Sequence, residues 1–172
     1  MTAKILVIDD EQIVLNSVKK ILGHGEYEVE ATLSGRQGLE WALSKSYDIV
    51  LTDVRMPDMG GMLILRDIKK AKPSMPVIII TGYANVQSAM QAMKLGAAEY
   101  IEKPFTPDQL TDKVNQALAQ KVIESRPHPE QGYRACLGLM RLGKRYGDGR
   151  LEAACERAEH LRSYSYRTVK NI

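Results

Sequence analysis

The sequence predicts an α/β protein built on a five-stranded, parallel, doubly wound sheet, and three observations support this fold class. Over residues 1–120, five short apolar runs alternate with longer stretches whose apolar residues recur at helical spacing. The runs are rich in β-branched residues and too short to be helices. Strands that alternate with helices pair in parallel through right-handed crossovers, and the site of such a sheet lies at the carboxyl ends of its strands.

The first three strand–helix pairs are apolar runs followed by amphipathic stretches. Strands are predicted over residues 4–8, 27–31 and 48–52. Helices are predicted over residues 13–22, 34–43 and 62–71. Ser34 is a candidate N-cap, because its hydroxyl can accept a hydrogen bond from a free amide of the first turn. Gly23 and the pair Lys72-Pro73 are expected to end the first and third helices, since glycine and the residue before proline disfavour helix continuation.

The last two pairs complete the alternation. The strand predicted over residues 76–81 is apolar throughout, so we expect it to be buried on both faces. The other elements are a helix over residues 85–95, a strand over 99–102 and a helix over 108–120. Gly96 is expected to close the helix before it as the C′ residue.

Length and composition narrow the class of protein. A chain of 172 residues allows roughly one to one and a half domains. With 44% apolar and 26% charged residues, it is not a disordered or collagen-like protein. Apolar runs such as residues 77–80 are too short to cross a bilayer, and the first residues do not resemble a signal peptide. The two cysteines cannot make a disulfide framework, so we expect a cytoplasmic protein with no membrane partner.

The net charge of +3 is distributed unevenly along the chain. Residues 1–120 hold 13 basic and 15 acidic residues, whereas residues 121–172 hold 11 and 6. Residues 121–132 include two prolines and a glycine and are predicted to be a linker, followed by a small helical segment over residues 133–172. This asymmetry indicates two segments with different partners.

Polar residues follow the predicted strands where each one ends. They are Asp9, Asp10, Asp53, Thr81 and Lys103. Parallel topology brings these ends together, and three carboxylates in one cleft need a cation to offset their repulsion. Oxygen ligands with open positions suit Mg²⁺. The lysine ammonium and the threonine hydroxyl suit a phosphoryl group carried on one carboxylate.

Four motifs at these strand ends are characteristic of one family. They are VIDDE at residues 7–11, LTDVRMP at 51–57, ITG at 80–82 and EKPF at 102–105. In this order they resemble the receiver domain of two-component response regulators, over roughly residues 2–120. The resemblance implies a flavodoxin-like sheet of strand order 2-1-3-4-5. It also implies a regulatory phosphoacceptor rather than an enzyme, one that catalyses only its own phosphorylation and dephosphorylation.

The resemblance implies a role for each site residue. Asp53 is the expected phosphoacceptor. Asp9, Asp10, Asp53 and the backbone carbonyl of Arg55 are the expected Mg²⁺ ligands, and Lys103 is expected to contact a phosphate oxygen. On its own, Asp10 could instead cap the first helix, but the joint pattern favours the metal site.

Two further pairs are implied to control the phosphorylated state. Thr81 and Tyr100 form the expected switch, in which the hydroxyl turns toward the phosphoryl group and the ring moves inward. This changes the surface of the fourth helix, fifth strand and fifth helix. Taken alone, Tyr100 would be an ordinary half-buried strand aromatic. Arg55 and Tyr83 flank the path of attacking water, and their bulk predicts slow self-dephosphorylation. The family also implies a cis peptide bond between Lys103 and Pro104.

The implied partners are a histidine kinase or a phosphotransfer protein, and a second copy of the chain on phosphorylation. Residues 81–97 are similar to receivers of the enhancer-binding regulators that act with sigma-54 polymerase. No ATPase motif follows, and DNA binding is not expected from the receiver.

The C-terminal part contains HPEQGYRACLGL at residues 128–139 and LEAACERA at residues 151–158. It resembles the C-terminal end of an insertion-sequence DDE transposase that works with an AAA+ helper ATPase, without that family's catalytic acids. The only property that this resemblance implies for the tail is a contact with such a helper ATPase. Two alternatives stay open: a protein-interaction module acting through this tail, and a DNA-binding regulator using its basic residues. The latter are Arg134, Arg141, Lys144, Arg145 and Arg150.

Overall fold

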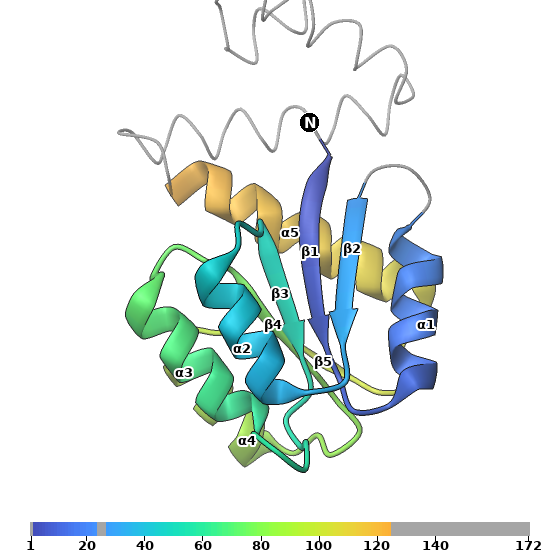
Figure 1. Ribbon diagram of the computed structural model, residues 1–172, viewed down its shortest axis with the longest axis vertical. Helices are drawn as coiled ribbons and strands as arrows, with labels where there is room; N and C mark the ends of the chain where they lie inside the picture. Colours follow the sequence, from blue (N-terminus) through green and yellow to red (C-terminus); the bar gives the residue numbers. More distant parts are fainter. Residues whose placement is uncertain (1, 24–26, 125–172) are drawn as a thin grey trace, which may run out of the picture. The chain divides into compact units, whose positions relative to one another are not determined.

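A computed structural model describes residues 2–23 and 27–124 of the chain (Figure 1). The chain divides into two units, Met1–Lys121 and Val122–Ile172, and all five strands belong to the first. Most of the predicted linker and all of the predicted tail, residues 133–172, lie outside the described residues. The resemblance to a transposase end and the two functions that depend on the tail therefore stay predictions.

Five parallel strands form one sheet in the order β2-β1-β3-β4-β5, which confirms the predicted fold class and strand order. The strands are β1 (Ala3–Ile8), β2 (Tyr27–Thr32), β3 (Ile49–Thr52), β4 (Val77–Thr81) and β5 (Glu99–Glu102). The helices are α1 (Gln12–Leu22), α2 (Gly35–Ser44), α3 (Gly61–Ala71), α4 (Val86–Lys94) and α5 (Pro107–Glu124). Each strand and helix predicted within residues 1–120 is present, with bounds that differ by a few residues.

Helices cover both faces of the sheet, and the alternation of side chains along each strand divides the core in two (Figure 1). On one face, Leu6 and Ile79 pack with the buried residues of α2 and α3. On the other, Ile5 and Ile78 pack with those of α1 and α5. The central strands β3 and β4 are buried along their whole length, as predicted for the apolar run before Thr81.

The helix ends follow the predicted local signals. Ser34 precedes α2 and its side chain accepts a hydrogen bond from Gln37 N at 3.2 Å. Gly96 follows α4 with a φ of +89°, a left-handed conformation that favours glycine. One expectation was wrong: α5 continues to Glu124, so the first four residues of the predicted linker are helical. The N-cap of α1 is Glu11, so the alternative role of Asp10 as the cap of this helix is not observed.

None of the helices within residues 2–23 and 27–124 combines the length and the hydropathy that a bilayer crossing requires.

Candidate functional site

The carboxyl ends of four neighbouring strands meet at one edge of the sheet and bring the predicted polar residues together. Asp9 follows β1, Asp53 follows β3, Thr81 ends β4 and Lys103 follows β5. Backbone hydrogen bonds continue the pairing just past the strands, from Asp53 N to Ile8 O at 2.9 Å and from Lys103 N to Thr81 O at 2.9 Å. These backbone hydrogen bonds therefore fix the positions of the Asp53 and Lys103 Cα atoms relative to the neighbouring strands. The Lys103-Pro104 peptide bond is cis, as expected.

The Lys103 ammonium lies among three carboxylates. Its Nζ is 2.7 Å from Asp9 Oδ2, 3.2 Å from Glu11 Oε1 and 3.8 Å from Asp53 Oδ1. Burial by itself would lower the pKa of Lys103, but the hydrogen bond and the charge of Asp9 outweigh it and raise that pKa above its ordinary value. The lysine is therefore a fixed positive charge at neutral pH.

Asp9 is buried and has a partner for each carboxylate oxygen. Oδ2 faces Lys103, and Oδ1 accepts a hydrogen bond from Glu11 N at 2.9 Å. Burial nevertheless raises the pKa of this carboxyl above its ordinary value, because the two partners offset the loss of water only in part. An additional positive charge nearby would therefore stabilise the ionised form of Asp9.

Asp53 is buried and only partly satisfied. Its Oδ2 accepts a hydrogen bond from Arg55 N at 3.3 Å, whereas its buried Oδ1 has no hydrogen-bond partner. The backbone around it is tightly packed, since a Cβ added to Gly61 would lie 1.8 Å from Asp53 O. An unpartnered buried oxygen is rare and costs free energy, so it marks a place where a ligand is expected.

The structure brings Asp9 and Asp53 together but leaves the Asp10 side chain exposed. Within residues 2–23 and 27–124, no three His, Cys, Asp or Glu side chains are arranged to hold a metal ion. Mg²⁺ takes few protein ligands and keeps several waters, so it does not need such a group. Two buried carboxylates, one with an unpartnered oxygen, fit the hard oxygen ligands that Mg²⁺ prefers.

The predicted switch residues lie on neighbouring strands but have different partners. Thr81 is fully buried, and its Oγ1 accepts a hydrogen bond from Tyr83 N at 3.2 Å. Tyr100 is half-buried, and its hydroxyl lies 2.8 Å from Ser88 Oγ on α4. Ser88 was not identified from the sequence, although its spacing from Asn85 is that of a capping box.

Arg55 and Tyr83, predicted to flank the phosphoacceptor, contact each other. The Arg55 guanidinium lies 4.0 Å from the centre of the Tyr83 ring, a cation–π contact between the loops after β3 and β4. Sequence position alone gave no indication of this stacking.

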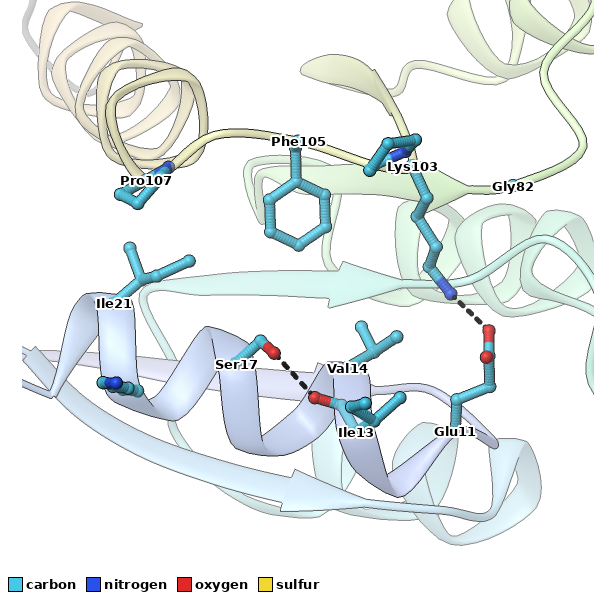
Figure 2. Close-up of a pocket in the computed structure, with 11 residues that line it drawn as sticks. Glu11, Ile13, Val14, Ser17, Ile21, Gly82, Lys103, Phe105 and Pro107 are labelled. Carbon is cyan, nitrogen blue, oxygen red and sulfur yellow. Dashed lines mark hydrogen bonds and ion pairs between the residues drawn. The ribbon is translucent and has the colours of Figure 1, made fainter.

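A groove of about 830 Å³ opens beside the site (Figure 2). One wall is α1 and the other is the segment after β5. Figure 2 shows Ile13, Val14 and Ile21 facing Phe105 across it, with the Lys103–Glu11 ion pair at one end. The groove is therefore mostly apolar, although Ser17 and Lys20 also line it, and it is charged where it meets the site.

Comparisons with known proteins identify the family of the chain. A family model described as "Response regulator receiver domain" matches residues 5–115. The chain is 40% identical over 119 residues to the transcriptional regulatory protein ZraR of Escherichia coli O157:H7, a match that spans 69% of this chain and 27% of that protein. This agrees with the likeness to sigma-54-type regulators predicted from residues 81–97. The chain thus spans about a quarter of the length of this curated relative.

Solved structures give the same result. A CheY-like response regulator receiver domain from Methanospirillum hungatei JF-1 is 33% identical, with a TM-score of 0.70, and covers 73% of this chain and 100% of that one. A beryllofluoride-activated NtrC4 receiver domain dimer is 30% identical, with a TM-score of 0.66, and covers 69% of this chain and 98% of that one. The family model alone spans more than half of the sequence, so the chain belongs to the response regulator receiver family of two-component systems.

Proposed function

We propose that this chain accepts a phosphoryl group on Asp53 from a histidine kinase or a phosphotransfer protein, with Mg²⁺ as cofactor. The observation that carries the proposal is the buried Asp53 Oδ1, which has no hydrogen-bond partner and lies 3.8 Å from Lys103 Nζ. Such an oxygen is costly in the unmodified protein but available as a nucleophile. The chain would act as a regulatory phosphoacceptor, which changes only its own phosphorylation state.

In the proposed transfer, a carboxylate oxygen of Asp53 attacks the phosphorus of a phosphohistidine. The new O–P bond forms as the P–N bond breaks, and the imidazole nitrogen keeps the electron pair and takes up a proton. The Lys103 ammonium offsets negative charge on the phosphoryl oxygens. Membership of the receiver family supports this chemistry.

The residues that would hold Mg²⁺ are Asp9, Asp53 and the backbone carbonyl of Arg55. Asp10 follows Asp9 directly and is the remaining candidate, although its side chain is exposed. When bound, the ion supplies positive charge between the carboxylates and the phosphoryl oxygens. This chain's own contribution is to hold the two aspartates just past the ends of adjacent, hydrogen-bonded strands.

Thr81 and Tyr100 would transmit phosphorylation to the surface of α4, β5 and α5. The Thr81 hydroxyl already accepts a bond from Tyr83 N, so its proton is left to donate to a phosphoryl oxygen. Val86, Met90 and Met93 form an exposed apolar stripe on α4 at helical spacing. A second copy of the phosphorylated chain is the proposed partner for this stripe. The dimeric NtrC4 receiver supports this assignment.

The apolar groove between α1 and Phe105 is the proposed contact for the kinase. Ile13 on its rim is 72% exposed, and with Val14, Ile21 and Phe105 it forms a continuous apolar surface of the kind that marks a protein contact. The groove leads to Lys103, so a helix that carries the phosphohistidine and lies in it would bring the phosphoryl group to the site.

Phosphorylation with acetyl phosphate tests the proposal. The full chain is incubated with Mg²⁺, and its intact mass is measured. We expect the wild type to gain one phosphoryl group and Asp53→Asn to gain none. Asp67→Asn, a change at a partly exposed position of α3, should behave like the wild type. A wild type that gains no phosphoryl group, or an Asp53→Asn variant that is still labelled, would contradict the proposal.

A further inference from the structure

The loop between β3 and α3 is tied to the start of α2 by the carboxylate of Asp58. Asp58 Oδ2 accepts hydrogen bonds from Ser34 Oγ at 2.7 Å and from Arg36 N at 3.0 Å, and Oδ1 accepts one from Gly35 N at 3.1 Å. With the Ser34 bond to Gln37 N, every amide that the first turn of α2 leaves free has a partner. A residue more than twenty positions away along the chain therefore completes the cap of this helix.

The backbones on either side of these bonds are in close contact. A Cβ added to Gly35 would lie 2.6 Å from Met59 O and 3.2 Å from the terminal methyl of Met56, so only glycine lets the loop approach this closely. The Arg36 amide, with Ser34 and Gly35, lowers the pKa of Asp58 to about 2, which keeps its carboxylate ionised at neutral pH. The negative charge also complements the positive end of the helix. Asp58 is thus held in one place.

The same loop carries the proposed Mg²⁺ ligand Arg55 three residues before Asp58. Its first part is held by Arg55 N on Asp53 Oδ2 and by Gly61 N on Val54 O. A backbone carbonyl is directed by its chain and not by its own side chain, and the Arg55 guanidinium is occupied by the Tyr83 ring. On its other side the Arg55 peptide is continuous with the segment that Asp58 holds, so the direction of the carbonyl depends on both halves of the loop.

We propose that Asp58 is a positioning residue, which fixes the β3–α3 loop so that the Arg55 backbone carbonyl stays where Mg²⁺ needs it. This inference rests on the proposed function. Mg²⁺ demands near-ideal octahedral geometry, so a small displacement of one ligand weakens binding strongly. Residues that orient metal ligands typically change metal affinity by roughly 10- to 100-fold when they are replaced.

The opposite end of α2 offers a matched control. Lys72 Nζ donates to Ala42 O at 2.8 Å and to Lys45 O at 3.0 Å, so a residue flanking α3 also caps this end of α2. Lys72→Ala removes a tie of the same kind at the end of the helix remote from the site. This substitution should lower the free energy of unfolding and leave the loop that carries Arg55 unchanged.

The test is the Mg²⁺ dissociation constant of the unphosphorylated full chain, measured by calorimetry, beside thermal unfolding in EDTA. We expect Asp58→Ala to raise the dissociation constant about tenfold or more. Asp58→Asn, which keeps one acceptor oxygen, should fall between it and the wild type. Lys72→Ala should lower the melting temperature and leave the dissociation constant unchanged.

The outcomes separate the two proposals. If the variants at Asp58 lose stability but bind Mg²⁺ like the wild type, Asp58 is only a helix cap and the inference is wrong, while the proposed function stands. If Lys72→Ala weakens Mg²⁺ as much as Asp58→Ala, general destabilisation explains the effect, and the inference is again wrong. A wild type that binds no Mg²⁺ overturns both. Asp58→Asn provides the test if Asp58→Ala does not fold.

Discussion

Lys103 pairs with Asp9, with Nζ and Oδ2 2.7 Å apart, while the proposed phosphoacceptor is left with an unpartnered oxygen. The Lys103 side chain is only 13% exposed, so water compensates little of the charge on either group. The pair stabilises one buried carboxylate and leaves the other with an oxygen that has no hydrogen bond and lies 3.8 Å from the same ammonium. The same ammonium lies close enough to Asp53 to interact with a group placed on it.

Replacing Lys103 by methionine should destabilise the fold and abolish phosphorylation. The variant leaves Asp9 and Asp53 buried without a positive partner, and removing one member of a buried pair costs roughly 3–5 kcal/mol. Lys113→Ala removes a pair with Glu99 that is far more exposed and should cost less than about 1 kcal/mol. Urea unfolding at neutral pH in EDTA measures both. If both variants lost the same free energy of unfolding, Lys103 would not stabilise the buried Asp9 and Asp53 carboxylates more than an exposed ion pair does.

Asp58 should make the chain more sensitive to acid. Its pKa is lowered from 3.8 to about 2, chiefly by the hydrogen bond from Arg36 N. A carboxyl with a lowered folded-state pKa contributes stability above its unfolded value, and that contribution is lost as the pH falls from about 4 toward 2. Asp58→Asn should therefore show a shallower loss of stability over this range in urea unfolding. A variant that follows the wild type at every pH would rule out this role.

Opening the contact between Arg55 and Tyr83 should shorten the lifetime of the phosphorylated state. The stack joins the loops that follow β3 and β4. We expect its bulk to hinder in-line attack by water on a phosphoryl group at Asp53. A cation–π contact of about 1 kcal/mol corresponds to a several-fold change in rate. We expect Arg55→Asn and Tyr83→Ala each to raise the rate of phosphate loss several-fold. The double variant should lose phosphate at nearly the same rate as either single variant, because each single change already removes the contact. A lifetime that is unchanged in both single variants would refute the prediction.

The contact between Ser88 and Tyr100 should hold α4 in its unphosphorylated arrangement. Ser88→Ala removes the partner of the Tyr100 hydroxyl and half of the capping box at Asn85, each worth about 1 kcal/mol. The switched arrangement should then be several-fold more populated before phosphorylation, as seen in the amide chemical shifts of α4. Ser88→Thr keeps the hydroxyl and serves as the control. If the amide chemical shifts of Ser88→Ala match those of the wild type, the Ser88–Tyr100 contact does not hold α4 in its unphosphorylated arrangement.

The groove on α1 should matter for transfer from a kinase and not for a small phosphodonor. Ile13→Glu places a charge on the groove at little cost to folding, because the side chain is already exposed. We expect phosphotransfer from the kinase to fall at least tenfold and labelling by acetyl phosphate to stay unchanged. The matched control is Leu63→Glu, because the Leu63 side chain is also exposed but lies on α3, away from the groove. If the two variants receive phosphate from the kinase equally well, the groove is not the contact.

Signals that are local in sequence predicted most of the fold. The apolar run of β4, the Ser34 cap and the turn at Gly96 depend on neighbouring residues, and all three are present. The strand ends then followed from parallel topology, which brought Asp9 and Asp53 together.

Contacts between distant segments could not be predicted in the same way. Asp58 reaches back to α2, and Ser88 reaches forward to Tyr100. Both pairings depend on how the helices pack against the sheet, which no local pattern specifies. The exposure of Asp10 likewise depends on where α1 begins, which is at Gln12 with Glu11 as the N-cap.

The most direct test of Asp53 as phosphoacceptor is to locate the phosphoryl group chemically. The chain is phosphorylated with and without Mg²⁺, the acyl phosphate is trapped by borohydride reduction, and the peptides are sequenced by mass spectrometry. We expect reduction at Asp53 only, and only in samples that contained Mg²⁺. Reduction at Asp9 or Asp10, or equal reduction at Asp53 in EDTA, would contradict the proposed site.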